Sequence, residues 1–102
     1  MLVHNSYNHG CEWAAERRSH WRNEGARYFG KANPDQFSAS GTYKLTQKNI
    51  DLMMKGKAPF GVDGMKVQLH HTVGITNDFY SYIEITFTEH FAKFVELHPW
   101  LF

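Results

Sequence analysis

The sequence predicts a small single domain of the α+β class. The chain has 102 residues, which is the length of one domain. Apolar residues make up 42% of it and aromatic residues 16%, which is enough for a modest hydrophobic core. The C-terminal third alternates between strand-like and helix-like hydrophobic patterns, and two helix-like segments precede it. The chain has 11 Lys+Arg against 10 Asp+Glu, so any contact with nucleic acid is local rather than spread over a basic surface. No apolar run is long enough to insert stably into a membrane, and the single cysteine excludes an intrachain disulfide framework.

The first helix is predicted over Glu12–Glu24, because this segment contains no Gly or Pro until Gly25. Asn5 or Asn8 is the expected N-cap, and Gly25 the expected end. Residues 25–43 are rich in turn formers and are predicted to be mostly loop.

A second, short helix is predicted to begin after Thr46 as its cap and to end at Gly56. Its apolar side is formed by Ile50, Met53 and Met54. Asp63-Gly64 is then a strong signal for a hairpin turn, and the alternation in Met65–Leu69 predicts a half-buried strand.

After a loop over residues 72–81, Tyr82–Thr86 alternates again and predicts a second strand. Thr86 and Glu89 have the spacing of a capping box, which predicts that a helix starts there; Pro99 ends it. The apolar stripe of this helix consists of Phe87, Phe91, Phe94, Val95 and His98. The residues expected in the core are Ile83, Ile85, Phe91, Phe94 and Val95.

Histidines gather around this strand–loop–strand–helix unit. His70 and His71 end the first strand, and His90 lies in the first turn of the helix. Neighbouring residues of a strand point to opposite faces, so the pair can divide labour, one binding a metal ion and the other moving a proton. Alternatively, His90 is an ordinary half-buried residue, and His98 on the apolar stripe is either a hydrogen-bonded core histidine or a ligand.

Leu69-His70-His71, followed by the segment 82–90 and by Leu97-His98, resembles the LHH group of the HNH/endonuclease VII nuclease superfamily. The upstream segment 43–64 is similar to the helix and "Gly-x-Ala-Pro-x-Gly-x-Asp-Gly" lead-in of that group. The resemblance covers about residues 42–98.

The resemblance implies an HNH-like ββα-metal core, to which the N-terminal helices are additions. It implies that His70 and His90 are metal ligands and that His71 is the general base that deprotonates the attacking water. The implied cofactor is one divalent ion, with Zn, Mg, Mn and Ni as candidates. Such an ion polarises the scissile phosphate and stabilises the leaving oxygen.

The sequence departs from the wider HNH pattern at two places. The central Asn that orients the base has no match, so a backbone carbonyl is the alternative partner of His71. The position one helical turn after His90 is Phe94. His98 lies eight residues after His90, roughly 12 Å along a regular helix, so it ligates the same ion only if the helix breaks or bends.

Further residues have two interpretations each. Asp63 fits a turn better than a metal site. Arg17 and Arg18, on the predicted first helix, are candidate phosphate contacts, as is Lys66 beside the site. The same arginines also fit an ordinary solvated helix face.

The N-terminal Leu2-Val3-His4-Asn5 resembles the end of Hint (hedgehog/intein-type) domains. Such segments often precede the toxin tips of bacterial polymorphic toxins of the Rhs or contact-dependent inhibition type. The resemblance implies that residues 1–5 are a remnant of an upstream processing segment and that 6–102 are the nuclease toxin domain. It also implies a secreted or delivered effector that acts in the target-cell cytoplasm, and a cognate immunity protein that protects the producer.

The sequence thus predicts a metal-dependent endonuclease that hydrolyses phosphodiester bonds, with DNA as the expected substrate. One alternative keeps the site and changes the substrate to RNA, because a ββα site acts on the phosphate and does not select the sugar. The other is a non-enzymatic interaction module with a structural zinc ion, against which the near absence of cysteine counts.

Overall fold

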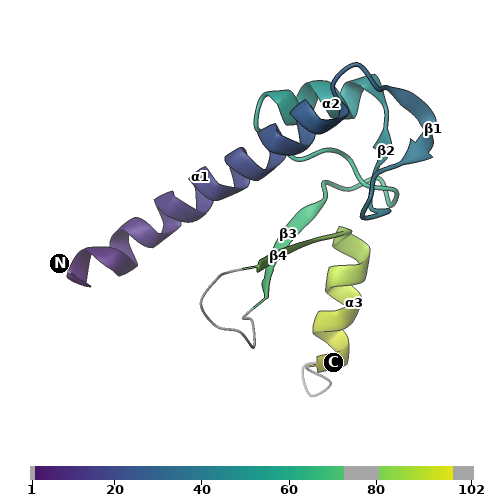
Figure 1. The fold of residues 1–102 in the computed structure, drawn as a ribbon. Helices are drawn as coiled ribbons and strands as arrows, with labels where there is room; N and C mark the ends of the chain where they lie inside the picture. Colours follow the sequence, from purple (N-terminus) through teal and green to yellow (C-terminus); the bar gives the residue numbers. More distant parts are fainter. Residues whose placement is uncertain (1, 73–80, 98–102) are drawn as a thin grey trace.

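The computed structural model describes residues 2–72 and 81–97, with side chains described over 13–70 and 82–93. In this part of the chain the strands form two small antiparallel sheets, β1–β2 and β3–β4 (Figure 1). The predicted α+β class is confirmed. The elements in chain order are α1 (Leu2–Tyr28), β1 (Asn33–Phe37), β2 (Lys44–Leu45), α2 (Gln47–Met54), β3 (Gln68–Thr72), β4 (Ser81–Ile85) and α3 (Phe87–Leu97).

Helix α1 is longer than predicted at both ends. It starts at Leu2, so Asn5 and Asn8 lie within it and are not its N-cap. It also continues through Gly25 to Tyr28, so the predicted end was wrong. A Cβ atom on Gly25 would lie 2.8 Å from the Met54 backbone nitrogen, which shows that the glycine is there to let α1 and α2 approach closely.

The segment predicted as mostly loop contains a β-hairpin. Strand β1 pairs antiparallel with β2, with an irregular register between Asn33 and Phe37. Every residue of β1 is exposed, and Pro34 is within it, as is typical of an edge strand. Gly30 and Ser40-Gly41 lie at turns, as predicted, but Asn33-Pro34-Asp35 lies within β1. Strand β1 carries no apolar alternation that would reveal it in the sequence.

The core lies where α1, α2, β2 and the segment before β3 meet. Tyr43 is completely buried, and its ring makes edge-on contacts with Trp21 and Tyr28. Its hydroxyl donates a hydrogen bond of 2.7 Å to the Glu24 carboxylate. The buried members of this cluster are Trp21, Tyr43, Leu45, Ile50, Met53 and Val67.

Helix α2 forms as predicted. The Thr46 side chain accepts a hydrogen bond from the Asn49 backbone nitrogen, and Gly56 follows the helix with a positive φ of 79°. Asn49 is buried, and both the nitrogen and the oxygen of its side-chain amide form hydrogen bonds. The nitrogen donates to the carbonyls of Lys44 and Phe60, and the oxygen accepts from the Phe60 backbone nitrogen. This single side chain fixes the chain segment that leads into β3.

The predicted turn at Asp63-Gly64 is present. Gly61 donates its amide to the Met65 carbonyl, and Gly64 adopts φ 84°. Strand β3, however, starts at Gln68 and runs to Thr72, so the predicted strand over Met65–Leu69 was placed about three residues too early. His70 and His71 lie in this strand, close to its C-terminal end, as predicted. Of the predicted loop, residues 73–80 lie outside the described residues.

Helix α3 starts directly after β4, as the capping box predicts. Thr86 Oγ1 accepts a hydrogen bond of 3.1 Å from the Glu89 backbone nitrogen. A second free amide, that of Thr88, donates to Asp63 Oδ2 at 2.9 Å. The interpretation of Asp63 as a turn residue is confirmed, because its other oxygen accepts from the Met65 nitrogen, and the same carboxylate also anchors α3.

Part of the predicted core at α3 is exposed. Ile85 is buried, but Ile83 is 41% and Phe91 is 52% exposed. Phe87, also on the predicted apolar stripe, is exposed as well and stacks on Phe91. A sheet of two strands presents few side chains on each face, so it does not cover the whole stripe of a helix. The predictions for Phe94 and Val95 concern side chains that lie outside the described ones, and the predicted end at Pro99 also lies outside them.

Candidate active site

The candidate site is built on the β3–β4 hairpin, which lies between α1 and α3 (Figure 1). The register pairs Gln68 with Ile85, His70 with Ile83 and Leu69 with Glu84. Side chains alternate between the two faces of a sheet. The face that holds Gln68 and His70 contacts α3, whereas Leu69 packs on the core beside α1.

His70 of β3 and His90 of α3 lie side by side. Their ring centroids are 4.9 Å apart, and the rings are inclined at 63°. Twenty residues separate the two histidines along the chain, but the direct passage from β4 into α3 places the first turn of the helix against β3. The predicted convergence of these two imidazoles is thus present in the fold.

Gln68 orients the His90 ring. The Nδ1 atom of His90 donates a hydrogen bond of 2.6 Å to Gln68 Oε1. When Nδ1 carries the proton, Nε2 keeps its lone pair and is the nitrogen that can bind a metal ion. Histidine ligands in metal sites usually have such a partner on their other ring nitrogen. Sequence reasoning missed Gln68, although its position two residues before His70 on a strand was a usable signal.

The other predicted site histidines are only partly described. The backbone of His71 is in β3, where it pairs with Tyr82. Its side chain, and all of His98, lie outside the described residues, so their predicted roles as general base and as possible ligand stay predictions. Among the residues that the structure describes, no group of three or more His, Cys, Asp or Glu side chains is placed to hold a metal ion.

The described residues nevertheless fit part of a metal site. Two imidazoles from different elements lie against each other, and one of them has its Nδ1 atom engaged by an amide oxygen. This is the donor chemistry of a site for a transition metal ion such as zinc or nickel, which imidazole nitrogen suits. His70 and His90 would hold the ion, and further ligands would come from His98, from water or from substrate.

On its α1 face, the hairpin is held by a polar network around Glu84. Glu84 Oε2 accepts a hydrogen bond of 2.7 Å from His20 Nε2, and Oε1 accepts one of 2.5 Å from Ser40 Oγ. Burial raises the pKa of Glu84, but the hydrogen bonds from His20 and Ser40 outweigh it and hold the pKa below its ordinary value. One carboxylate thus ties β4 both to α1 and to the loop before β2.

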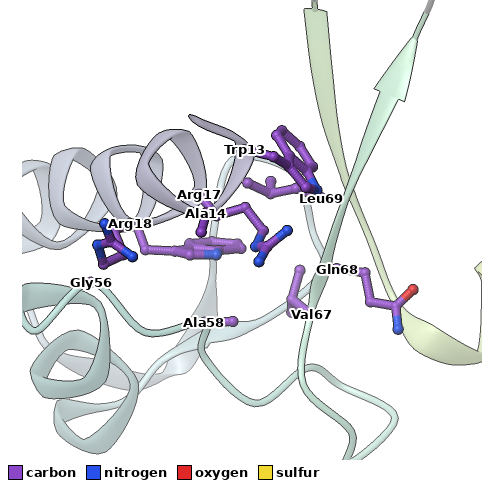
Figure 2. A pocket seen from close by; sticks show the side chains of 10 residues that line it. Trp13, Ala14, Arg17, Arg18, Gly56, Ala58, Val67, Gln68 and Leu69 are labelled. Carbon is purple, nitrogen blue, oxygen red and sulfur yellow. The ribbon is translucent and has the colours of Figure 1, made fainter. Parts of the chain in front are cut away.

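The predicted phosphate contacts lie at a cavity between α1 and β3. Arg17 and Arg18 line this cavity, and so does Gln68 (Figure 2). Lys66 is not among the residues that line it, but its Nζ donates a hydrogen bond of 2.7 Å to the carbonyl of Ala58, which is a lining residue. The structure therefore places Arg17 and Arg18 at one cavity, and phosphate binding by these arginines and by Lys66 stays a prediction.

Among the described residues, none of the helices combines the length and the hydrophobicity that crossing a bilayer requires.

Comparison with curated proteins and with solved structures gave no match. A family model does match residues 48–100; it is described as LHH, a nuclease of the HNH/ENDO VII superfamily with conserved LHH. The matched segment is just over half of the chain and contains Leu69-His70-His71, both strands of the hairpin and α3. The chain therefore belongs to the LHH family of nucleases within the HNH/endonuclease VII superfamily.

Proposed function

We propose that the protein is a metal-dependent endonuclease that hydrolyses phosphodiester bonds in DNA. The single observation that carries this proposal is the contact of His70 with His90, in which Gln68 leaves Nε2 of His90 available for a metal ion. A strand, a second strand and a helix present these two imidazoles at one place, and the LHH motif of the family lies on the first strand.

In the proposed reaction, a water molecule attacks the phosphorus atom of the scissile diester. His71 accepts the proton from this water as the new P–O bond forms and the bond to the leaving oxygen breaks. His70 and His90 hold one divalent ion, which when bound supplies positive charge to the scissile phosphate and the leaving oxygen. Gln68 keeps the His90 ring in the orientation and tautomer that binding requires.

The division of roles between adjacent histidines has a physical basis. A general base needs a neutral imidazole at the working pH, and an unperturbed histidine titrates near pH ~6.5. A histidine whose lone pair is committed to a metal ion is not available as a base. Removing His71 is therefore expected to stop cleavage and to leave metal binding intact.

The test compares supercoiled plasmid and a structured RNA as substrates, each with a divalent metal ion and with excess chelator. The wild type is measured beside His71→Ala and beside Asp51→Asn, an exposed position on α2 that serves as control. The proposal expects metal-dependent nicking of DNA that is lost in His71→Ala and kept in Asp51→Asn. Cleavage of RNA alone would select the RNase alternative. A folded protein that cleaves neither substrate, and that unfolds under chelator, would select the structural-zinc alternative.

We further propose that this nuclease is the toxin domain of a bacterial polymorphic toxin. The proposal is supported by the Leu2-Val3-His4-Asn5 segment, which resembles the end of a Hint domain. It implies delivery into the cytoplasm of a competing cell and a cognate immunity protein in the producer. Expression of the domain inside a bacterium is expected to arrest growth, whereas expression of His71→Ala is not. Equal growth of the two strains at equal protein levels would contradict the toxin proposal.

A further inference from the structure

A cavity of about 470 Å³ lies between α1 and β3, on the α1 side of the catalytic hairpin (Figure 2). Its floor is apolar, with Trp21, Val67 and Ala58 among its lining residues. Its charged lining residues are Arg17 and Arg18, and no acidic side chain of the described part of the chain lines it. The cavity is therefore a hollow with a cationic rim and fits an anionic group.

The two arginines are not neutralised within the described part of the protein. There, the side-chain ion pairs join His20 to Glu84 and Arg27 to Glu24, and neither involves Arg17 or Arg18. Arg17 lies with its guanidinium carbon 5.2 Å from the centre of the Trp13 ring, a contact that restricts its orientation while the N–H groups stay free to bind. A guanidinium group binds phosphate oxygens in pairs, which makes arginine well suited to this ligand.

Further positive charge surrounds the same hollow. Gly56 lines it, and the absence of a side chain there brings Arg18 and Arg22 against the end of α2: a Cβ atom would lie 3.3 Å from Arg18 Cβ and 3.2 Å from Arg22 Nε. Lys66 binds the carbonyl of the lining residue Ala58, and burial and the nearby Lys57 lower its pKa. Positive charges that lie this close together repel one another, and a bound anion reduces this repulsion.

The hollow and the candidate active site share strand β3. Gln68 is among the residues that line the hollow, but its side chain points away from Arg17 and Arg18 (Figure 2), toward α3, where its amide oxygen accepts the hydrogen bond from His90. Leu69, another lining residue, directly precedes His70 on β3. One residue of a strand spans about 3.3 Å, so the lining residues Gln68 and Leu69 are within one or two residues of His70 along β3, although the His70 side chain is on the α3 face. Phosphates of one DNA strand follow each other at about 3.4 Å along the helix axis.

We infer that this cavity, with Arg17 and Arg18, binds a backbone phosphate of the nucleic-acid substrate close to the phosphate that is cleaved. The inference rests on the proposed function, because the subsite is defined by the neighbouring phosphate that the proposed nuclease cleaves. Contacts to the backbone position a nucleic acid without selecting its sequence. The subsite therefore contributes affinity and alignment equally for all base sequences.

The test measures binding separately from cleavage. All proteins carry His71→Ala, and fluorescence anisotropy reports the affinity for two labelled DNA duplexes of unrelated sequence over a range of salt concentrations. The double variant Arg17→Gln/Arg18→Gln is compared with Arg27→Gln/Lys31→Gln, which removes the same charge at and just after the C-terminal end of α1, from residues that do not line the cavity. Melting curves verify that both variants fold.

A protein that loses its contact with one backbone phosphate of a duplex is expected to lose about 0.9 from the slope of log affinity against log salt. The inference expects a decrease of that order in Arg17→Gln/Arg18→Gln, with the same loss of affinity for both sequences. The control variant is expected to keep the parental slope. Equal slopes in the two variants, or a loss for one sequence alone, would overturn the inference.

The same substitutions in the active protein separate the two proposals. Arg17→Gln/Arg18→Gln is expected to raise KM for plasmid cleavage while kcat stays close to that of the wild type, because uniform binding is lost. A wild type that cleaves nothing, combined with the expected change of salt slope, refutes the nuclease proposal and supports the phosphate subsite. A wild type that cleaves, with an unchanged KM in the variant, refutes the subsite alone.

Discussion

Replacement of Gln68 by leucine tests whether the hydrogen bond to His90 prepares this ring for metal binding. The side chain of Gln68 is half-buried, and its Oε1 atom accepts the Nδ1 proton at 2.6 Å. Leucine has a similar size but no acceptor, so His90 loses its orienting partner and its preferred tautomer. Loss of such a partner typically costs about 10- to 100-fold in metal affinity or activity. At 1.4 kcal/mol for each factor of ten, this corresponds to about 1.4–2.8 kcal/mol.

The assay is the initial rate of plasmid nicking as a function of divalent metal concentration. Gln68→Leu is expected to need at least tenfold more metal for half-maximal rate and to recover much of its rate at saturation. Gln68→Glu is the matched control, because its carboxylate still accepts the Nδ1 proton, and it is expected to stay close to the wild type. A folded Gln68→Leu protein whose metal titration superimposes on that of the wild type would refute the proposed role of Gln68.

Three further predictions concern the scaffold and are checked by thermal or denaturant unfolding. Gly25→Ala is expected to destabilise the protein by roughly 1–3 kcal/mol, because the new Cβ atom meets backbone atoms of α2, at 2.8 Å from the Met54 nitrogen; equal or greater stability would contradict this contact. Tyr43→Phe is expected to cost about 1 kcal/mol, since it leaves a half-buried carboxylate of α1 without its 2.7 Å hydrogen bond; an unchanged unfolding midpoint would argue against that bond. Hydrogen bonds, first that from the Thr88 amide, lower the pKa of Asp63, so its contribution to stability is complete above pH ~4 and is lost as the pH falls through the lower folded-state pKa. Asp63→Asn is expected to reduce this acid-side loss of stability, and a pH profile identical to that of the wild type would show that Asp63 does not anchor α3.

Local signals in the sequence were sufficient for the elements that they define. Thr46 and Gly56 delimit α2, and Thr86 starts α3, because caps and positive-φ glycines act within a few residues of chain. The juxtaposition of His70 and His90 also followed, since a strand pair that runs directly into a helix restricts where the first helical turn lies.

The remaining errors concern contacts between distant segments. Gly25 was predicted to end the first helix. The close approach of α2 at this position explains why α1 continues through the glycine. Phe91 reads as core, but its exposure depends on how little surface a two-stranded sheet offers. The sequence did not predict that the Glu84 carboxylate holds β4 to α1 and to the loop before β2. Its hydrogen-bond partners His20 and Ser40 lie 64 and 44 residues away along the chain.

Calorimetric titration with a divalent transition metal ion tests most directly the claim that His70 and His90 hold the ion while His71 accepts the proton. The protein is titrated as wild type, His70→Ala, His90→Ala and His71→Ala, and each sample is then assayed for plasmid cleavage. The account predicts one binding event that is lost or strongly weakened in His70→Ala and His90→Ala and kept in His71→Ala, with no cleavage by any of the three variants. Metal binding that survives in both His70→Ala and His90→Ala, or robust cleavage by His71→Ala, would contradict it.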